Sequence, residues 1–161
     1  MLDSAFISAL VAEHGRWLMA FLRGMGNAAD AEDAFQEVWL RVMRASADPA
    51  NWKAYLTVVA RSVVIDRLRR THPADSLDEV DEEIPDVSPA PDERYASKAT
   101  AEAVRAAIAA LPFNLRQVVL MRVEGEMEFK DIATELGVPL GTTLTWMHRA
   151  TQELKRRLND I

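Results

Sequence analysis

The sequence predicts an all-α fold: two small helical domains joined by an acidic flexible linker, the second domain holding a helix-turn-helix. Apolar residues recur at helical spacing through most of the chain, and no set of alternating strands is found. Four prolines and nine acids fall within residues 73–93, a composition typical of a linker, although a loop packed on the surface is the alternative. The predicted domains are therefore residues 1–72 and 94–161.

The first domain is predicted to contain three helices. Residues 4–24 place apolar side chains at steps of three, four and seven, and a glycine-rich stretch follows them. A second helix begins near Asp30, whose carboxylate is expected to cap the exposed N–H groups, and it stops before Pro49. The third helix spans about 51–70. Its β-branched residues would also suit a strand, but its length and the spacing of its charges favour a helix.

The second domain is predicted to contain four helices. The first two span about 93–110 and 114–125, and they are separated by a proline. Two shorter segments, 128–136 and 141–158, flank Gly137, which fits the left-handed position of a tight turn. Two helices joined through a glycine and a short turn are the pattern of a helix-turn-helix.

The charge of the chain is unevenly distributed. The net charge is −6, but residues 73–93 hold nine of the 25 acids and none of the 19 lysines and arginines. The rest of the chain therefore carries 16 acids against 19 bases, a net of +3. Because phosphate contacts supply most of the affinity for DNA, any DNA binding must come from local basic clusters.

Several classes of protein are disfavoured by composition. The chain has no cysteine, which excludes disulfides and thiolate zinc sites and favours a reducing compartment. No apolar run approaches the roughly 20 residues that cross a bilayer, so no membrane insertion is expected. His14, His72 and His148 lie far apart, and no glycine-rich phosphate-binding loop occurs. We therefore expect a cytoplasmic protein that is not an enzyme, with no metal and no cofactor.

Three helices have the chemistry of interaction surfaces, each with a simpler alternative. The last helix begins with a cluster of threonines that would reach base edges, unless the unit is only a helical hairpin with a solvated basic end. The 30–44 helix has acids at its start and arginines at its end, which complements its dipole and is also compatible with docking a partner. The 51–70 helix combines Trp52 and Tyr55 with arginines, as in sites for single-stranded DNA, although both rings would equally suit a core.

Three motifs, met in order, resemble those of bacterial RNA polymerase sigma factors. The sequence DAEDAFQEVWLR at 30–41 is similar to their core-polymerase-binding helix, and YLTVVARSVVIDRLRR at 55–70 is similar to the helix that follows it. ALPFNLRQVVL at 110–120 and the helix-turn-helix resemble the family's C-terminal region. With only a linker between the motifs, the resemblance is to the two-domain extracytoplasmic-function (ECF) group.

The resemblance implies an alternative sigma factor that binds core RNA polymerase, directs promoter recognition and transcription initiation, and is controlled by an anti-sigma factor. The first domain would bind core polymerase and the −10 element, and the second would read the −35 element as duplex. By position, the implied core-polymerase-binding residues are Asp30, Asp33, Gln36, Glu37, Leu40 and Arg41. Those for the −10 element are Tyr55, Arg61, Ser62, Asp66, Arg67, Arg69 and Arg70, and those for the −35 element are Arg116, Thr142, Thr143, Thr145, Trp146 and Arg149.

The chain departs from the family pattern mainly in the last helix. Leu144 and Trp146 replace two cations, and Thr143 replaces an apolar core residue. Two interpretations follow. Either the protein reads an unusual −35 sequence with Leu144 or Trp146 against thymine methyls, or the domain has shifted towards protein contact, where a partner would bury an exposed Trp146 as an anchor. Arg156 and Arg157, with Lys155, are expected to meet phosphates. Two other functions stay open: a sigma-like mimic that sequesters an anti-sigma factor, and a stand-alone helix-turn-helix regulator.

Overall fold

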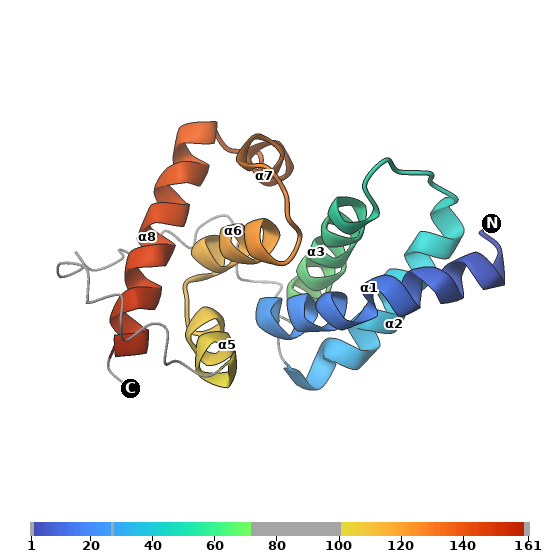
Figure 1. Ribbon diagram of the computed structural model, residues 1–161, viewed down its shortest axis with the longest axis horizontal. Coiled ribbons are helices and arrows are strands. Elements are labelled where there is room, and N and C mark those ends of the chain that lie inside the picture. Colours follow the sequence, from blue (N-terminus) through green and yellow to red (C-terminus); the bar gives the residue numbers. More distant parts are fainter. Residues whose placement is uncertain (1, 27, 72–100, 160–161) are drawn as a thin grey trace. The chain divides into compact units, whose positions relative to one another are not determined.

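The computed structural model of the protein describes residues 2–26, 28–71 and 101–159, and these residues are helical apart from short connections (Figure 1). No strand occurs within those ranges, so the all-α prediction is confirmed. The predicted linker at 73–93 and the first part of the helix predicted at 93–110 lie outside the described residues. The elements are α1 (Ser4–Met25), the 3-10 turn η1 (Ala28–Asp30), α2 (Ala31–Ala45), α3 (Trp52–Thr71), α5 (Ala101–Ala109), α6 (Phe113–Val123), α7 (Phe129–Leu136) and α8 (Leu140–Asn159).

The chain forms two compact units. Unit 1 comprises its described residues up to 71 together with Leu120–Met127, and unit 2 comprises the described residues from 101 to 119 and from 128 to 159. Among the described residues, none of the helices combines the length with the apolar composition that crossing a bilayer requires.

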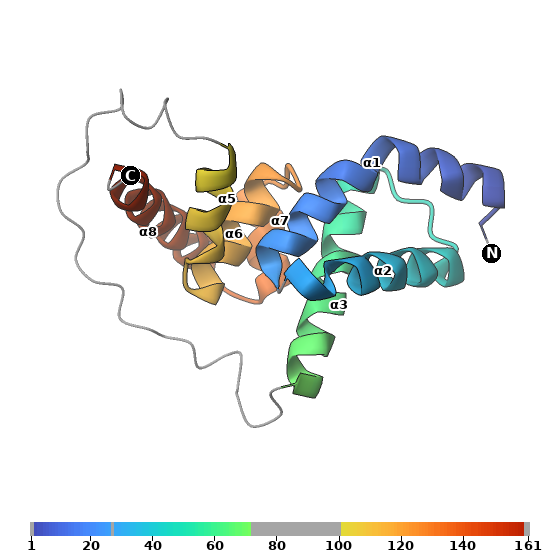
Figure 2. The ribbon, with the colours of Figure 1, turned by 90° about the horizontal axis from the view of Figure 1, so that it is seen from below.

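Unit 1 is built on three helices, α1, α2 and α3, each packed against the other two (Figures 1 and 2). Each helix turns one apolar stripe inward, as the helical spacing of the sequence predicts. Burying one large apolar side chain contributes about 1.5–3 kcal/mol, so this core dominates the stability of the unit. The fully buried residues of the three helices include Leu18, Phe21, Leu22, Met25, Val38, Val42, Leu56, Ala60 and Val63.

Side-chain caps define two helix starts in unit 1. The backbone N–H of Ala5 donates to Asp3 Oδ1 at 3.0 Å, and that of Ala54 donates to Asn51 Oδ1 at 3.2 Å. The capping role expected of Asp30 is wrong. Asp30 ends a 3-10 turn with helical dihedral angles (φ −93°, ψ −5°), and its carboxylate makes no capping hydrogen bond. A cap needs an extended backbone to aim its side chain at the first free N–H groups, and the turn removes that geometry.

Unit 2 places three helices against α8. Leu111, Leu115, Val119 and Ala150 form its buried cluster, and α5 and α7 both contact α8. The predicted turn of the helix-turn-helix is confirmed. Gly137 has φ +70°, and its N–H donates to the carbonyl of Thr134 at 3.2 Å. This left-handed conformation is costly for a residue with a Cβ, which explains the glycine.

Candidate functional site

A network of ion pairs joins α2 to α3 in unit 1. Arg41 Nη2 donates to Glu37 Oε1 at 2.7 Å and to Asp66 Oδ2 at 3.0 Å, and Arg41 Nη1 donates to Ser62 Oγ at 3.2 Å. Arg67 Nη1 donates to the other Glu37 oxygen at 3.1 Å. Two arginines thus share one carboxylate, and each links one helix to the other. We call Glu37, Arg41, Ser62, Asp66 and Arg67 the α2–α3 network.

The pKa values of the network follow from these contacts. Partial burial alone would raise the pKa of the Glu37 carboxyl, but hydrogen bonds from Arg41 and Arg67 and the charge of Arg70 outweigh it, so the pKa is lowered. Partial burial would lower the pKa of Arg41, whereas its bonds to Glu37 and Asp66 raise it. Both groups are therefore held in their charged forms. The network brings together residues that the sequence analysis assigned to two separate surfaces.

The outer face of α2 is open to solvent. Asp33, Gln36 and Leu40 are exposed along one stripe of the helix, and Leu40 has 47% of its surface accessible. Asp33 also lies 3.7 Å from Arg67 Nη2, at the edge of the α2–α3 network. An exposed apolar side chain flanked by a carboxylate and an amide suits contact with a protein better than contact with DNA.

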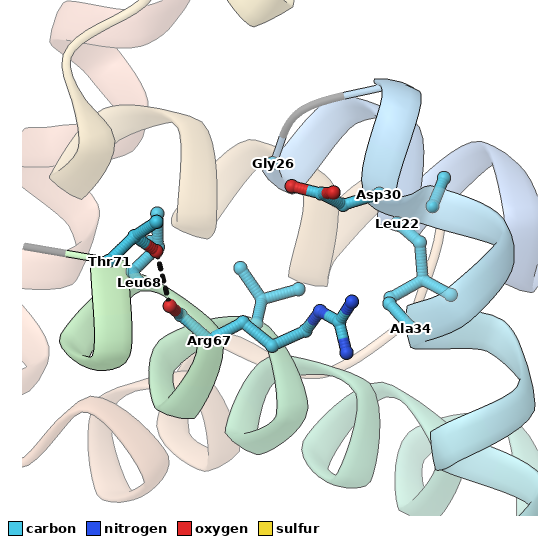
Figure 3. Close-up of a pocket in the computed structure, with 9 residues that line it drawn as sticks. Leu22, Gly26, Asp30, Ala34, Arg67, Leu68 and Thr71 are labelled. Carbon is cyan, nitrogen blue, oxygen red and sulfur yellow. Dashed lines mark hydrogen bonds between the residues drawn. The ribbon is translucent and has the colours of Figure 1, made fainter.

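A small hollow of about 60 Å³ lies between α1, the start of α2 and the end of α3 (Figure 3). Its apolar walls include Leu22, Ala34 and Leu68, while the Arg67 side chain extends along it and Asp30 stands at its rim. The Thr71 hydroxyl donates to the carbonyl of Arg67 at 2.6 Å, so it could only accept a hydrogen bond from a ligand. The hollow is smaller than the usual range for small-molecule sites, so a small-molecule ligand is not indicated.

The start of α3 presents aromatic and basic groups together. Trp52 packs edge-on against Tyr55 at 5.6 Å and against Phe6 of α1 at 5.8 Å, and all three rings keep some exposed surface. Lys53 Nζ lies 5.3 Å from the ring of Trp17. Phe6, Trp17 and Lys53 were missed by the sequence analysis, because only the fold brings α1 beside α3. These rings and cations are the chemistry that binds single-stranded nucleic acid.

The remaining arginines of α3 differ in accessibility. Arg69 and Arg70, at the end of the helix, are exposed, whereas Arg61 is half-buried and already has a partner. Arg69 and Arg70 can therefore bind a phosphate without breaking a buried contact.

In unit 2, the residues predicted to read duplex divide into inward and outward sets. Thr143 is fully buried, and its Oγ1 has no hydrogen-bond partner among the described residues. Trp146 is half-buried and packs on the Leu111 cluster, so the expectation of an exposed tryptophan is wrong. Thr142 is also half-buried, while Thr145 and Arg149 are exposed. Thr145 and Arg149 are therefore the members of this set that are open to a ligand.

Arg116, Arg156 and Arg157 of unit 2 have intramolecular partners. Arg116 Nη1 donates to the carbonyl of Ala109 at 2.9 Å, and burial lowers the pKa of its guanidinium. Arg156 and Arg157 both bind the buried carboxylate of Glu153, the latter through Nε at 2.8 Å. The bond from Arg156 outweighs burial and lowers the pKa of Glu153. These arginines are less available for phosphates than their charges suggest.

Within residues 2–26, 28–71 and 101–159, no cluster of His, Asp and Glu side chains is arranged to hold a metal ion. The chemistry that the surfaces offer is recognition: an apolar and acidic face on α2, an aromatic and basic region on α3, and the outward face of α8.

Comparison with known proteins identifies two families along the chain. Residues 10–73 match Sigma-70 region 2, and residues 101–154 match Sigma-70, region 4. The first match covers the α2–α3 network and the aromatic start of α3, and the second covers the helix-turn-helix.

Similar full-length proteins carry related names. The ECF RNA polymerase sigma factor SigL of Mycobacterium tuberculosis is 31% identical over 99% of this chain and 92% of its own length. SigE of Mycolicibacterium smegmatis, an ECF RNA polymerase sigma factor, is 32% identical over 91% of this chain, which spans 59% of that relative. The structure of the sigma factor RpoE with the anti-sigma factor NepR from Bartonella quintana has a TM-score of 0.70, at 20% identity and 98% coverage of both chains. The structural match supports the fold.

Proposed function

This chain belongs to the extracytoplasmic-function family of RNA polymerase sigma factors, and we propose on that basis which of its surfaces bind core polymerase, the −10 element and the −35 element. A sigma factor is not an enzyme. It binds core RNA polymerase and directs promoter recognition and transcription initiation. The observation that carries the assignment is the order of the two family matches along the chain.

The outer face of α2 docks on core polymerase. Asp30, Asp33, Gln36 and Leu40 are exposed and form a contact surface along one side of the helix, with an apolar side chain among polar ones. Glu37 and Arg41 lie at the edge of this surface and are engaged by α3. Their main contribution is to hold the surface in place relative to α3.

The −10 element meets α3. Tyr55 adds a partly open ring at the start of the helix, and Arg69 and Arg70 add exposed charge at its end. Arg61, Ser62, Asp66 and Arg67 lie between these two ends. Because Ser62, Asp66 and Arg67 belong to the α2–α3 network, polymerase docking on α2 and promoter contact on α3 act on one rigid pair of helices.

α8 binds the −35 element as duplex DNA. Thr145 and Arg149 are exposed on the second helix of the helix-turn-helix, which is the helix that enters the major groove in such motifs. Thr142 is half-buried beside them. Thr143, Trp146 and Arg116 support this surface from within the unit.

The protein acts in the cytoplasm, where its polymerase lies, and an anti-sigma factor controls it by covering the docking and DNA-reading faces. The similar structure of RpoE contains the anti-sigma factor NepR, which supports the proposal that an anti-sigma factor binds this chain. The linker at 73–93 connects the region 2-like domain, residues 1–72, to the region 4-like domain, residues 94–161.

The test is reconstitution with sigma-free core polymerase and a promoter library. We expect promoter-specific run-off transcripts from the wild-type chain and loss of core association in Leu40→Ala. For core association the matched control is Leu140→Ala on α8, a leucine with the same 47% exposure that lies outside the docking face and should leave binding to core polymerase unchanged. A chain that binds an anti-sigma factor but neither core polymerase nor promoter DNA would be a sigma-like mimic, and a dimer that footprints DNA without polymerase would be a stand-alone regulator.

A further inference from the structure

The outward face of α8 combines apolar and polar side chains. Thr143 and Ala150 are fully buried, and Trp146 packs on the core, which fixes the rotation of the helix about its axis. The opposite side of the first three turns is left open to solvent. It presents Leu140, Gly141, Leu144, Thr145, His148 and Arg149, all exposed.

Leu144 is notable on this face because of its position in the helix-turn-helix and not because of its exposure alone. Single exposed leucines are ordinary on protein surfaces. Leu144, 46% exposed, lies one turn into the second helix of a helix-turn-helix, where side chains reach base edges. In the family pattern a cation takes this position. A leucine there cannot bind a phosphate or donate a hydrogen bond to a base.

The surroundings of Leu144 favour DNA over protein as its partner. Glu153 is the one acid among the described residues of α8, and it is buried beneath Arg156 and Arg157. No carboxylate of this helix therefore faces outward to repel phosphates, while Arg149 adds an exposed positive charge. A Cβ added at Gly141 would meet no atom within 4 Å, so the backbone beside Leu144 can approach a ligand closely.

We infer that Leu144 is a specificity-determining residue that reads the 5-methyl group of a thymine in the −35 duplex. Thymine alone among the four bases presents a methyl group in the major groove, and apolar side chains are its natural partners. This inference rests on the proposed function and adds the chemistry that this chain recognises at one position. Trp146 is the other residue that replaces a cation, and its packing on the core leaves Leu144 as the reader.

The test removes the methyl group without changing base pairing. A −35 sequence is first selected from a randomised promoter library with wild-type holoenzyme, and each thymine is then replaced by deoxyuridine. At one position we expect promoter binding to weaken about fourfold, the factor that corresponds to ~0.8 kcal/mol for burying one methyl-sized group. Leu144→Ala should lose this sensitivity, and its affinities for the thymine and deoxyuridine promoters should agree within about twofold.

Two further variants sharpen the result. Val123→Ala removes apolar surface from another exposed side chain, 57% accessible on α6, and should keep the full deoxyuridine effect. Leu144→Lys restores the cation of the family pattern and should bind more tightly at low salt while losing the preference for thymine. Circular dichroism of each variant checks that α8 remains folded.

The outcomes of these experiments separate thymine reading by Leu144 from the sigma-factor function on which it rests. Deoxyuridine sensitivity that persists unchanged in Leu144→Ala, or no sensitivity at any thymine in the wild type, overturns the inference while leaving the sigma-factor function intact. Leu144→Ala that abolishes capture by an anti-sigma factor but leaves promoter selection unchanged overturns it in favour of a protein-binding face. Absence of any promoter-specific initiation by the wild type overturns the proposed function itself.

Discussion

Replacing Glu37 by glutamine tests whether the α2–α3 network stabilises unit 1. The carboxylate is 24% exposed and accepts bonds from Arg41 at 2.7 Å and from Arg67 at 3.1 Å. Glutamine keeps the size of the side chain and removes its charge. Both arginines lose their shared anion, and Arg41 retains Asp66 at 3.0 Å while Arg67 retains the more distant Asp33 at 3.7 Å.

The expected loss lies between two limits. Hydrogen bonds to charged groups contribute about 1.5–3 kcal/mol when buried. Exposed ion pairs contribute roughly 0.2–1 kcal/mol. For two bonds at a carboxylate that is three-quarters buried, with arginines about 30% exposed, we expect roughly 1–2 kcal/mol. For a domain of this size each kcal/mol lowers the melting temperature by about 4–8 °C.

Urea unfolding followed by tryptophan fluorescence measures this loss. A cycle of Glu37→Gln, Arg41→Gln and the double variant isolates the pairwise energy, which should reach about 0.5–1 kcal/mol for one shared bond. Glu13→Gln on α1, where the side chain is 73% exposed and Oε2 lies 3.8 Å from His14 Nε2, is the matched control and should change the free energy of unfolding by less than about 0.5 kcal/mol. A coupling energy near zero would refute the reasoning and leave the contacts as solvent-screened pairs.

Three other outcomes follow from the same structure. Glu37 and Glu153 have lowered pKa values in the folded state. The stability that these two carboxylates supply is therefore complete above the ordinary carboxyl pKa of about 4.3 and is lost as pH falls through the lowered values. Measuring the free energy of unfolding against pH should show this loss, and the free energy of Glu37→Gln should depend less on pH. Thr143→Val should raise the free energy of unfolding of unit 2 by about 1 kcal/mol in thermal melts, since it removes a buried hydroxyl without a partner. Gly137→Ala should lower it by about 1 kcal/mol because φ is +70°, whereas Gly137→Asn should lower it less.

Much of the fold was predictable because it follows from local rules. Helical spacing located the helices, and their bounds differ from expectation by at most two residues wherever both ends are described. Gly137 indicated the turn because a left-handed residue is a steric requirement that sequence reveals directly. The capping role of Asp30 failed because the 3-10 turn before α2 has no clear signal in composition.

The candidate site was less predictable, because its contacts join distant parts of the chain. Arg41 and Asp66 are 25 residues apart, and nothing in either motif indicates that they meet. The packing of Trp146 depends on the rotation of α8 against α6, which the outward residues alone do not determine. The pairing of Glu153 with Arg156 and Arg157 was within reach, since spacings of three and four place these side chains on one helix face.

Co-migration with sigma-free core polymerase tests the central claim most directly. The purified full chain and core polymerase are mixed without any inhibitor and separated by size, and the complex is then assayed on a selected promoter. We predict a stable one-to-one complex that starts transcription at a defined position and that is lost in Leu40→Ala. A wild-type chain that stays separate from the polymerase, although folded, would contradict the assignment of α2 and the function built on it.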